Sequence, residues 1–93
     1  MNYLVVDVGS SSVKICLAEL TEGRDFRMKD IYRLPMTRSF INGHLSTNVF
    51  LIYDCICRVL GNLVKENVRI ASLGIDSWCS DFCLLDLDTG SVL

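Results

Sequence analysis

Histidine, proline and paired cysteines are scarce in this chain of 93 residues, and each scarcity excludes a kind of site. His44 is the only histidine, Pro35 is the only proline, and no two of the five cysteines form a Cys-x-x-Cys pair. A zinc site and a disulfide framework are therefore both unexpected. We expect reduced thiols and a cytoplasmic protein, with Cys16, Cys55 and Cys57 as small apolar core residues.

Long apolar runs and clustered positive charge are also missing. No apolar run approaches the roughly 20 residues of a membrane-spanning helix, and the first residues lack the basic segment that begins a signal peptide. The formal net charge is −2 and the basic residues are scattered, which argues against nucleic acid as a partner. Hydrophobic residues nevertheless make up 51% of the chain. A domain this small buries only about 60% of its unfolded surface, so we expect it to pack against the remainder of a longer protein or a self-association partner.

The first third of the chain has the alternating and short apolar patterns of β-strands. The predicted strands cover residues 3–8, 13–20 and 26–34. Short turns at residues 9–12 and 21–25 join them. The alternation of the third strand changes phase at Ile31, which indicates a β-bulge. Residues 35–47, which contain the proline, are predicted to form a loop.

A helix is predicted from residue 49 to residue 65, or about 48–66 with its caps. Apolar residues recur there every three or four positions, and residues 46–48 are suitable N-cap residues. Residues 69–75 form a fourth predicted strand. The crossover helix before it makes this strand parallel to the first.

A fifth strand is predicted over residues 82–87, before a turn at residues 86–90. The fold class is therefore α/β, with a mixed sheet in the order β-β-β-α-β-β. This order resembles the ribonuclease-H-like, actin-like ATPase fold. Residues 1–93 would form an incomplete amino-terminal portion of the first domain of such a protein.

The stretch VVDVGSSSVK, residues 5–14, places Asp7 near the end of a buried strand. Burial removes hydration from a carboxylate, and Mg²⁺ held by one or two carboxylates, water and substrate phosphates is one way to compensate it. The small-residue turn that follows exposes N–H groups and hydroxyls to phosphate oxygens, and a basic residue comes next. The predicted phosphate-binding residues are Gly9, Ser10, Ser11, Ser12 and Lys14.

This turn differs from a P-loop, because it leads into a strand and the chain has no Gly-x-x-x-x-Gly-Lys-[Ser/Thr] motif. A structural interpretation is also open. On that interpretation, Asp7 caps an ordinary hairpin, in which the serines suit the geometry of the turn.

A second aspartate, Asp76, ends the fourth predicted strand. Ligands bind where the carboxyl ends of neighbouring parallel strands meet, so Asp7 and Asp76 are expected at the same edge of the sheet. Trp78 offers an apolar surface for a sugar ring, and Asp81 and nearby serines offer hydrogen-bonding groups. The alternative is that Trp78 belongs to the core and Asp81 begins a hairpin.

Together, VVDVGSSSVK and the later stretch RIASLGIDSWCSDFCLLDLDTG resemble the amino-terminal part of the FGGY carbohydrate kinases. Within that family the chain is most similar to the rhamnulokinases. The resemblance extends over essentially the whole chain, and its second stretch is the more specific one. It implies an ATP- and Mg²⁺-dependent kinase that phosphorylates a hydroxyl of a rhamnulose-like ketose.

The resemblance also implies roles for individual residues. It places Asp7 near the Mg²⁺–phosphate site and residues 10–14 along the ATP phosphates, with Lys14 where the family usually has arginine. The implied sugar-binding residues are Asp76, Trp78, Cys79 and Asp81. The catalytic base of the family lies beyond residue 93, so this chain is expected to contain no catalytic residue and to be inactive alone.

Two further positions and one short stretch depart from the family pattern. Val13 and Cys79 stand where rhamnulokinases have glycine, which crowds the phosphate turn and changes the sugar pocket. Residues 46–48, Ser-Thr-Asn, replace the usual Thr-Trp-Asp before the helix. The identity of the sugar therefore stays open.

Two other functions also stay open. The first is a non-catalytic actin-like binding or interaction module, whose apolar content would suit a face covered by a partner. The second is another actin-like kinase, acting on acetate or an N-acetyl sugar, against which the stretch GIDSWCSDF argues.

Overall fold

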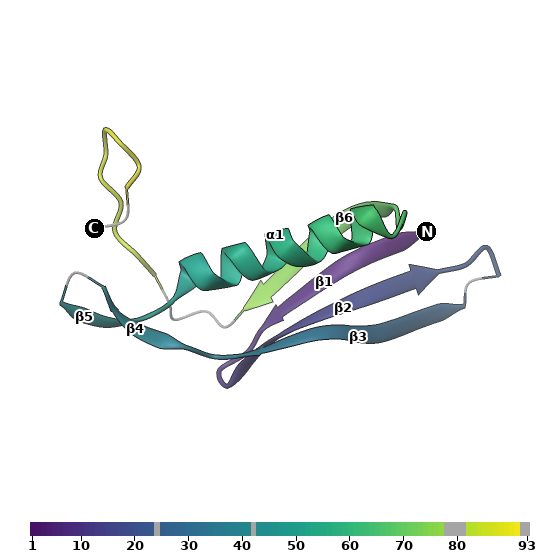
Figure 1. Ribbon diagram of the computed structural model, residues 1–93, viewed down its shortest axis with the longest axis horizontal. Helices are drawn as coiled ribbons and strands as arrows, with labels where there is room; N and C mark the ends of the chain where they lie inside the picture. Colours follow the sequence, from purple (N-terminus) through teal and green to yellow (C-terminus); the bar gives the residue numbers. More distant parts are fainter. Residues whose placement is uncertain (24, 42, 78–81, 92–93) are drawn as a thin grey trace.

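A computed structural model describes residues 1–23, 25–41, 43–77 and 82–91 of the chain. They form a small mixed α/β unit in which a four-stranded sheet carries one helix (Figure 1). The elements in chain order are β1 (Asn2–Val8), β2 (Ser12–Leu20), β3 (Phe26–Pro35), β4 (Arg38–Ile41), β5 (His44–Thr47), α1 (Val49–Lys65) and β6 (Ile70–Ser77).

The main sheet has the strand order β3-β2-β1-β6. Strands β1, β2 and β3 pair antiparallel through short turns, whereas β6 pairs with β1 in parallel. A parallel neighbour needs a long crossover connection, and α1 supplies it between the hairpins and β6 (Figure 1). The predicted meander and the parallel fourth strand are therefore confirmed.

The bulge predicted at Ile31 is present in β3. Tyr32 pairs with Ile15 and Asp30 pairs with Cys16, so Ile31 is an extra residue opposite β2. A bulge of this kind changes the face on which the following side chains lie. The phase change in the sequence thus reflects a real break in the register.

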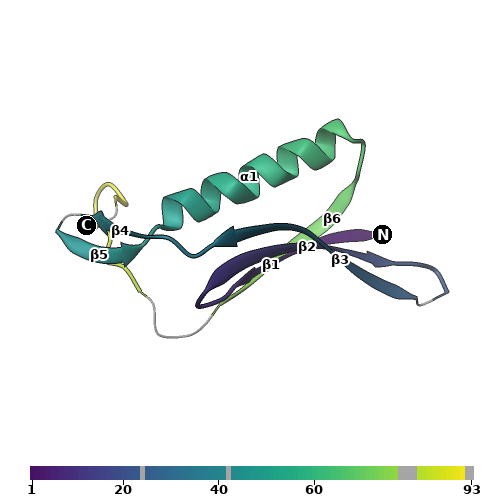
Figure 2. The same ribbon diagram turned by 60° about the horizontal axis from the view of Figure 1, so that its bottom comes forward.

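The core lies between α1 and one face of the sheet, as Figures 1 and 2 show. Its buried members from the strands are Leu4, Val6, Val13 and Ile15, and those from α1 are Cys55, Val59 and Leu63. Burying an aliphatic side chain stabilises a fold by about 1.5–3 kcal/mol, so this cluster holds the helix to the sheet. Cys16 and Cys55 are buried as predicted, but Cys57 is exposed, so its assignment to the core was wrong.

Asn48 begins α1, as predicted from the residues before the helix. Its side-chain oxygen accepts a hydrogen bond from the N–H of Leu51 at 3.1 Å, and its amide nitrogen donates to the hydroxyl of Ser39 at 3.2 Å. The cap satisfies one of the free N–H groups at the start of a helix. It also ties α1 to β4.

A Schellman motif ends α1. The N–H of Asn67 donates to the carbonyl of Val64 at 3.1 Å, and the N–H of Val68 donates to that of Leu63 at 2.9 Å. Asn67 has a φ of 60°, the left-handed conformation that this motif requires and that asparagine tolerates better than most residues. Val68 then packs against the core beside Leu63.

The prediction of a loop over residues 35–47 was wrong, because this segment contains the hairpin of β4 and β5. Ile41 pairs with His44, and Gly43 adopts a φ of 80° between them. Asn-Gly between two β-forming runs is a strong hairpin signal, since glycine adopts positive φ without strain. That dipeptide is the signal in the sequence for this hairpin.

The prediction of a fifth strand over residues 82–87 was also wrong. Within residues 82–91 the structure has no strand, and Leu85 makes only an isolated bridge. A strand needs a neighbouring strand for its backbone hydrogen bonds, and the described sheet ends at β6. The apolar side chains of this segment are exposed, namely Phe82, Leu84, Leu85 and Leu87.

The turn predicted at residues 86–90 is confirmed. The carboxylate of Asp86 accepts hydrogen bonds from the N–H groups of Asp88 and Thr89, each at 2.9 Å. These hydrogen bonds, the one from Thr89 foremost, lower the pKa of Asp86. Gly90 closes the turn with a φ of 72°.

Candidate functional site

Asp7 and Asp76 lie side by side in the sheet. They are direct partners in the parallel register of β1 and β6, and both are exposed. Their neighbours Val6 and Ile75 lie on the α1 side, so the alternation of side chains places both aspartates on the opposite face. The prediction that the two acidic strand ends meet at one edge of the sheet is confirmed.

The turn between β1 and β2 is tight at its base and free at its tip. The N–H of Gly9 donates to the carbonyl of Ser12 at 2.9 Å, and a Cβ on Gly9 would lie only 3.0 Å from that oxygen. Glycine therefore permits the close approach of the two strands. The N–H of Met36 also donates to the carbonyl of Ser11 at 2.9 Å, so the end of β3 supports the turn.

The donors at the tip of the turn are available to a ligand. Within the described residues, the N–H groups of Ser10 and Ser11 make no hydrogen bond, and neither do the hydroxyls of residues 10–12. Consecutive free N–H groups and hydroxyls form an anion-binding surface. The predicted phosphate-binding turn thus has the necessary free donors.

Four charged residues form one row across the sheet. Asp7 pairs with Lys14 on one side and with Asp76 on the other, and Lys14 pairs in turn with Arg33. From β3 to β6 the row is therefore Arg33, Lys14, Asp7 and Asp76. We call the face that carries these four residues the open face, because no described element covers it (Figure 2).

Lys14 was predicted to belong to this site, but Arg33 was not. Arg33 could have been found by extending the register of the third strand past the phase change at Ile31. The one-residue shift at Ile31 moves Arg33 to the face that carries Lys14.

Two carboxylates are fewer ligands than a metal site built from protein side chains alone needs. They suit a Mg²⁺ ion whose other ligands are water and phosphate. The part of the chain that the structure describes contains no group of three or more His, Cys, Asp or Glu side chains able to hold a metal. Mg²⁺ is usually bound by one or two carboxylates together with water and substrate phosphates. Asp7 and Asp76 are two carboxylates in direct register, and the turn at residues 9–12 lies next to Asp7.

Asp76 also makes a local hydrogen bond. Its Oδ1 accepts from the N–H of Ser77 at 3.0 Å, which orients the carboxylate at the end of β6. The other predicted sugar-binding residues, Trp78, Cys79 and Asp81, lie outside the residues that the structure describes.

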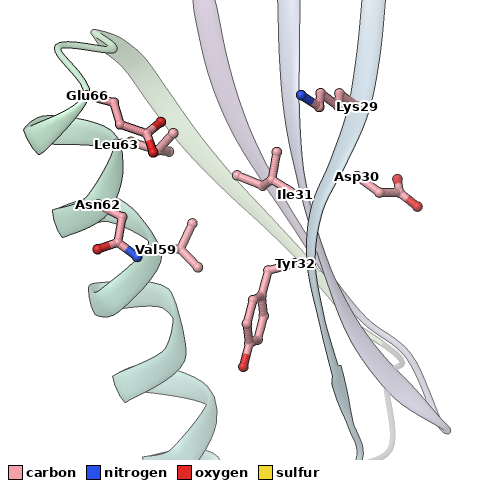
Figure 3. A pocket seen from close by; sticks show the side chains of 8 residues that line it. All are labelled: Lys29, Asp30, Ile31, Tyr32, Val59, Asn62, Leu63 and Glu66. Carbon is pink, nitrogen blue, oxygen red and sulfur yellow. The ribbon is translucent and has the colours of Figure 1, made fainter.

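A groove of about 330 Å³ lies between β3 and the C-terminal half of α1. Ile31 and Tyr32 project into it from β3, facing Val59 and Leu63 of α1, whereas Asp30 points to the other side of the strand (Figure 3). The groove is therefore on the α1 side of the sheet. It is separate from the four charged residues of the open face.

The buried thiols are not activated. Burial raises the pKa of Cys55, and burial together with a hydrogen bond from its Sγ to Oδ1 of Asp30 at 3.2 Å raises the pKa of Cys16. A nucleophilic cysteine needs a lowered pKa, so neither of these two residues is suited to that role.

No protein-family model matches the chain. Among the residues that the structure describes, no helix combines the length and the apolar character that a membrane span requires.

Proposed function

We propose that this chain is the amino-terminal part of an ATP-dependent carbohydrate kinase with the ribonuclease-H-like, actin-like fold. The observation that carries the proposal is the direct register of Asp7 with Asp76, beside a turn whose donors are free. Like charges on directly opposite strand residues destabilise a sheet. A bound cation and its phosphate ligands would offset that cost, which gives the pair a functional reason.

On this proposal each group has one task. Asp7 holds Mg²⁺, which when bound neutralises phosphate charge during transfer. The turn at residues 9–12 and Lys14 bind the phosphates of ATP, while Asp76, with Trp78, Cys79 and Asp81, binds the sugar. The acceptor is a hydroxyl of a ketose resembling rhamnulose.

The proton of that hydroxyl needs a general base, and neither aspartate of the pair is free for this task. We place the base in a segment beyond residue 93, so the chain by itself is inactive. The free thiols of the four described cysteines support a cytoplasmic location.

A second candidate is a non-catalytic interaction module of the same fold. It is favoured by apolar side chains that α1 and β6 leave exposed, among them Tyr53, Val64 and Ile75. On this candidate a protein partner covers them, and nucleotide binding is absent.

Calorimetric titration of Mg·ATP into the 93-residue chain distinguishes the two candidates. A kinase fragment binds Mg·ATP, and Asp7→Asn weakens binding by about tenfold or more, as expected for loss of a charged ligand. Asp54→Asn, an exposed aspartate of α1, is the control with the same change in charge and should bind as the original chain does. Absence of Mg·ATP binding by the original chain would refute the proposal that it is part of a kinase.

A further inference from the structure

The order of charges on the open face is unusual for a sheet that only needs to be stable. Opposite charges on neighbouring strands attract, and an alternating order would give three attractive pairs across four strands. The observed order instead places Arg33 beside Lys14 and Asp7 beside Asp76. Two of the three neighbouring pairs therefore repel each other.

The β-bulge is what brings Arg33 to this face. If β3 continued in the register of its first half, Tyr32 would pair with Lys14, and Arg33 would pair with Val13 beneath α1. The extra residue, Ile31, shifts the register by one and places Arg33 opposite Lys14 instead. Bulges often redirect a side chain next to a binding site.

No other described group neutralises the basic pair. Asp30 lies 3.9 Å from the guanidinium of Arg33, but both side chains are more than half exposed. An exposed ion pair at this distance contributes little. Lys14 has an acidic neighbour in Asp7, and that neighbour is itself shared with Asp76.

We infer that Arg33 is a phosphate-binding residue, which together with Lys14 holds the polyphosphate end of a nucleotide while Asp7 holds its cation. This inference rests on the proposed function. The row of charges then matches a Mg·nucleoside triphosphate with its acceptor, with the phosphates over β2 and β3, the metal at Asp7 on β1 and the sugar at Asp76 on β6. Arginine suits this role because its planar guanidinium can donate two parallel hydrogen bonds to a phosphate.

The test measures Mg·ATP affinity by calorimetry for the original chain and three variants. Arg33→Gln should weaken binding by about tenfold, the loss expected for one charged hydrogen bond, and Arg33→Lys should recover part of it. Arg27→Gln is the matched control. Arg27 lies on the same strand and pairs with Glu19 on the α1 side, so its replacement should leave the affinity unchanged.

Thermal unfolding of the same variants gives a second measurement. Without nucleotide, Arg33→Gln removes a repulsion and should raise the melting temperature. With saturating Mg·ATP, the same variant should melt below the original chain. This reversal is not expected of a residue with a purely structural role.

The outcomes separate this inference from the proposed function. If Arg33→Gln binds Mg·ATP as tightly as the original chain while Asp7→Asn does not, Arg33 has no role in binding and the kinase proposal stands. If the original chain does not bind Mg·ATP, both are overturned. If Arg27→Gln weakens binding as much as Arg33→Gln, net charge alone is responsible and the inference fails.

Discussion

Asp76→Asn changes the stability of the free chain in a direction that follows from the register. Asp76 has one charged partner across the strands, Asp7, and the two repel each other. Neighbouring strands lie about 4.8 Å apart, and two unit charges roughly 5 Å apart in water interact by about 0.8 kcal/mol. Asparagine keeps the oxygen that accepts from the N–H of Ser77, so only the charge is lost.

We therefore expect Asp76→Asn to raise the free energy of unfolding by about 0.5–1 kcal/mol at low salt. Asp7→Asn is the matched control. It removes the repulsion from Asp76 but also the attraction to Lys14, so its net effect should be close to zero.

Urea unfolding followed by circular dichroism measures this difference without nucleotide or Mg²⁺. The gain of Asp76→Asn should be largest near 0.01 M salt, where the Debye length is about 30 Å, and small near 1 M, where it is about 3 Å. A loss of stability at low salt would refute the reasoning. So would a gain that persists undiminished at high salt, because repulsion would then not be its cause.

Three further predictions concern the end of α1 and the thiols. Asn67→Gly should stabilise the chain and Asn67→Val should destabilise it by about 1–2 kcal/mol, because a β-branched residue resists positive φ; equal stability of both variants in urea unfolding would contradict the Schellman motif. Cys57 and Cys83 should react with a thiol reagent in the folded chain, whereas Cys16 and Cys55 should react only on unfolding. Because the pKa values of the two buried thiols are raised, their protonated forms favour the folded state, so stability should fall as the pH rises above about 9. Buried thiols that react at the rate of the exposed ones, or a stability independent of pH in that range, would contradict the described packing.

Much of the architecture followed from local patterns. Alternation predicted β1, β2 and β3, the apolar spacing predicted α1, and the change of phase at Ile31 predicted the bulge. These patterns succeed because each side chain of a strand or helix is assigned to a face by its position alone. The Asn-Gly dipeptide between β4 and β5 is an equally local signal, so this hairpin was also predictable from the sequence.

The prediction of a strand at residues 82–87 was wrong for a different reason. Its composition is that of a strand, but a strand is completed by a neighbour, and no local pattern reports whether a neighbour is present. In the described part of the chain β6 is the last strand of the sheet, and the apolar residues that follow it remain exposed.

The sequence by itself determined the composition of the candidate site. It placed Asp7 and Asp76 at the ends of two apolar strands and surrounded the first turn with small polar residues. Those features depend only on residue order.

The tertiary structure decided which of these groups are neighbours. Pairing between strands distant in the chain set Asp7 against Asp76, and the one-residue shift of the bulge moved Arg33 from beneath α1 to the side of Lys14. Register between strands is a long-range property, and a shift of one residue moves every later side chain to the opposite face.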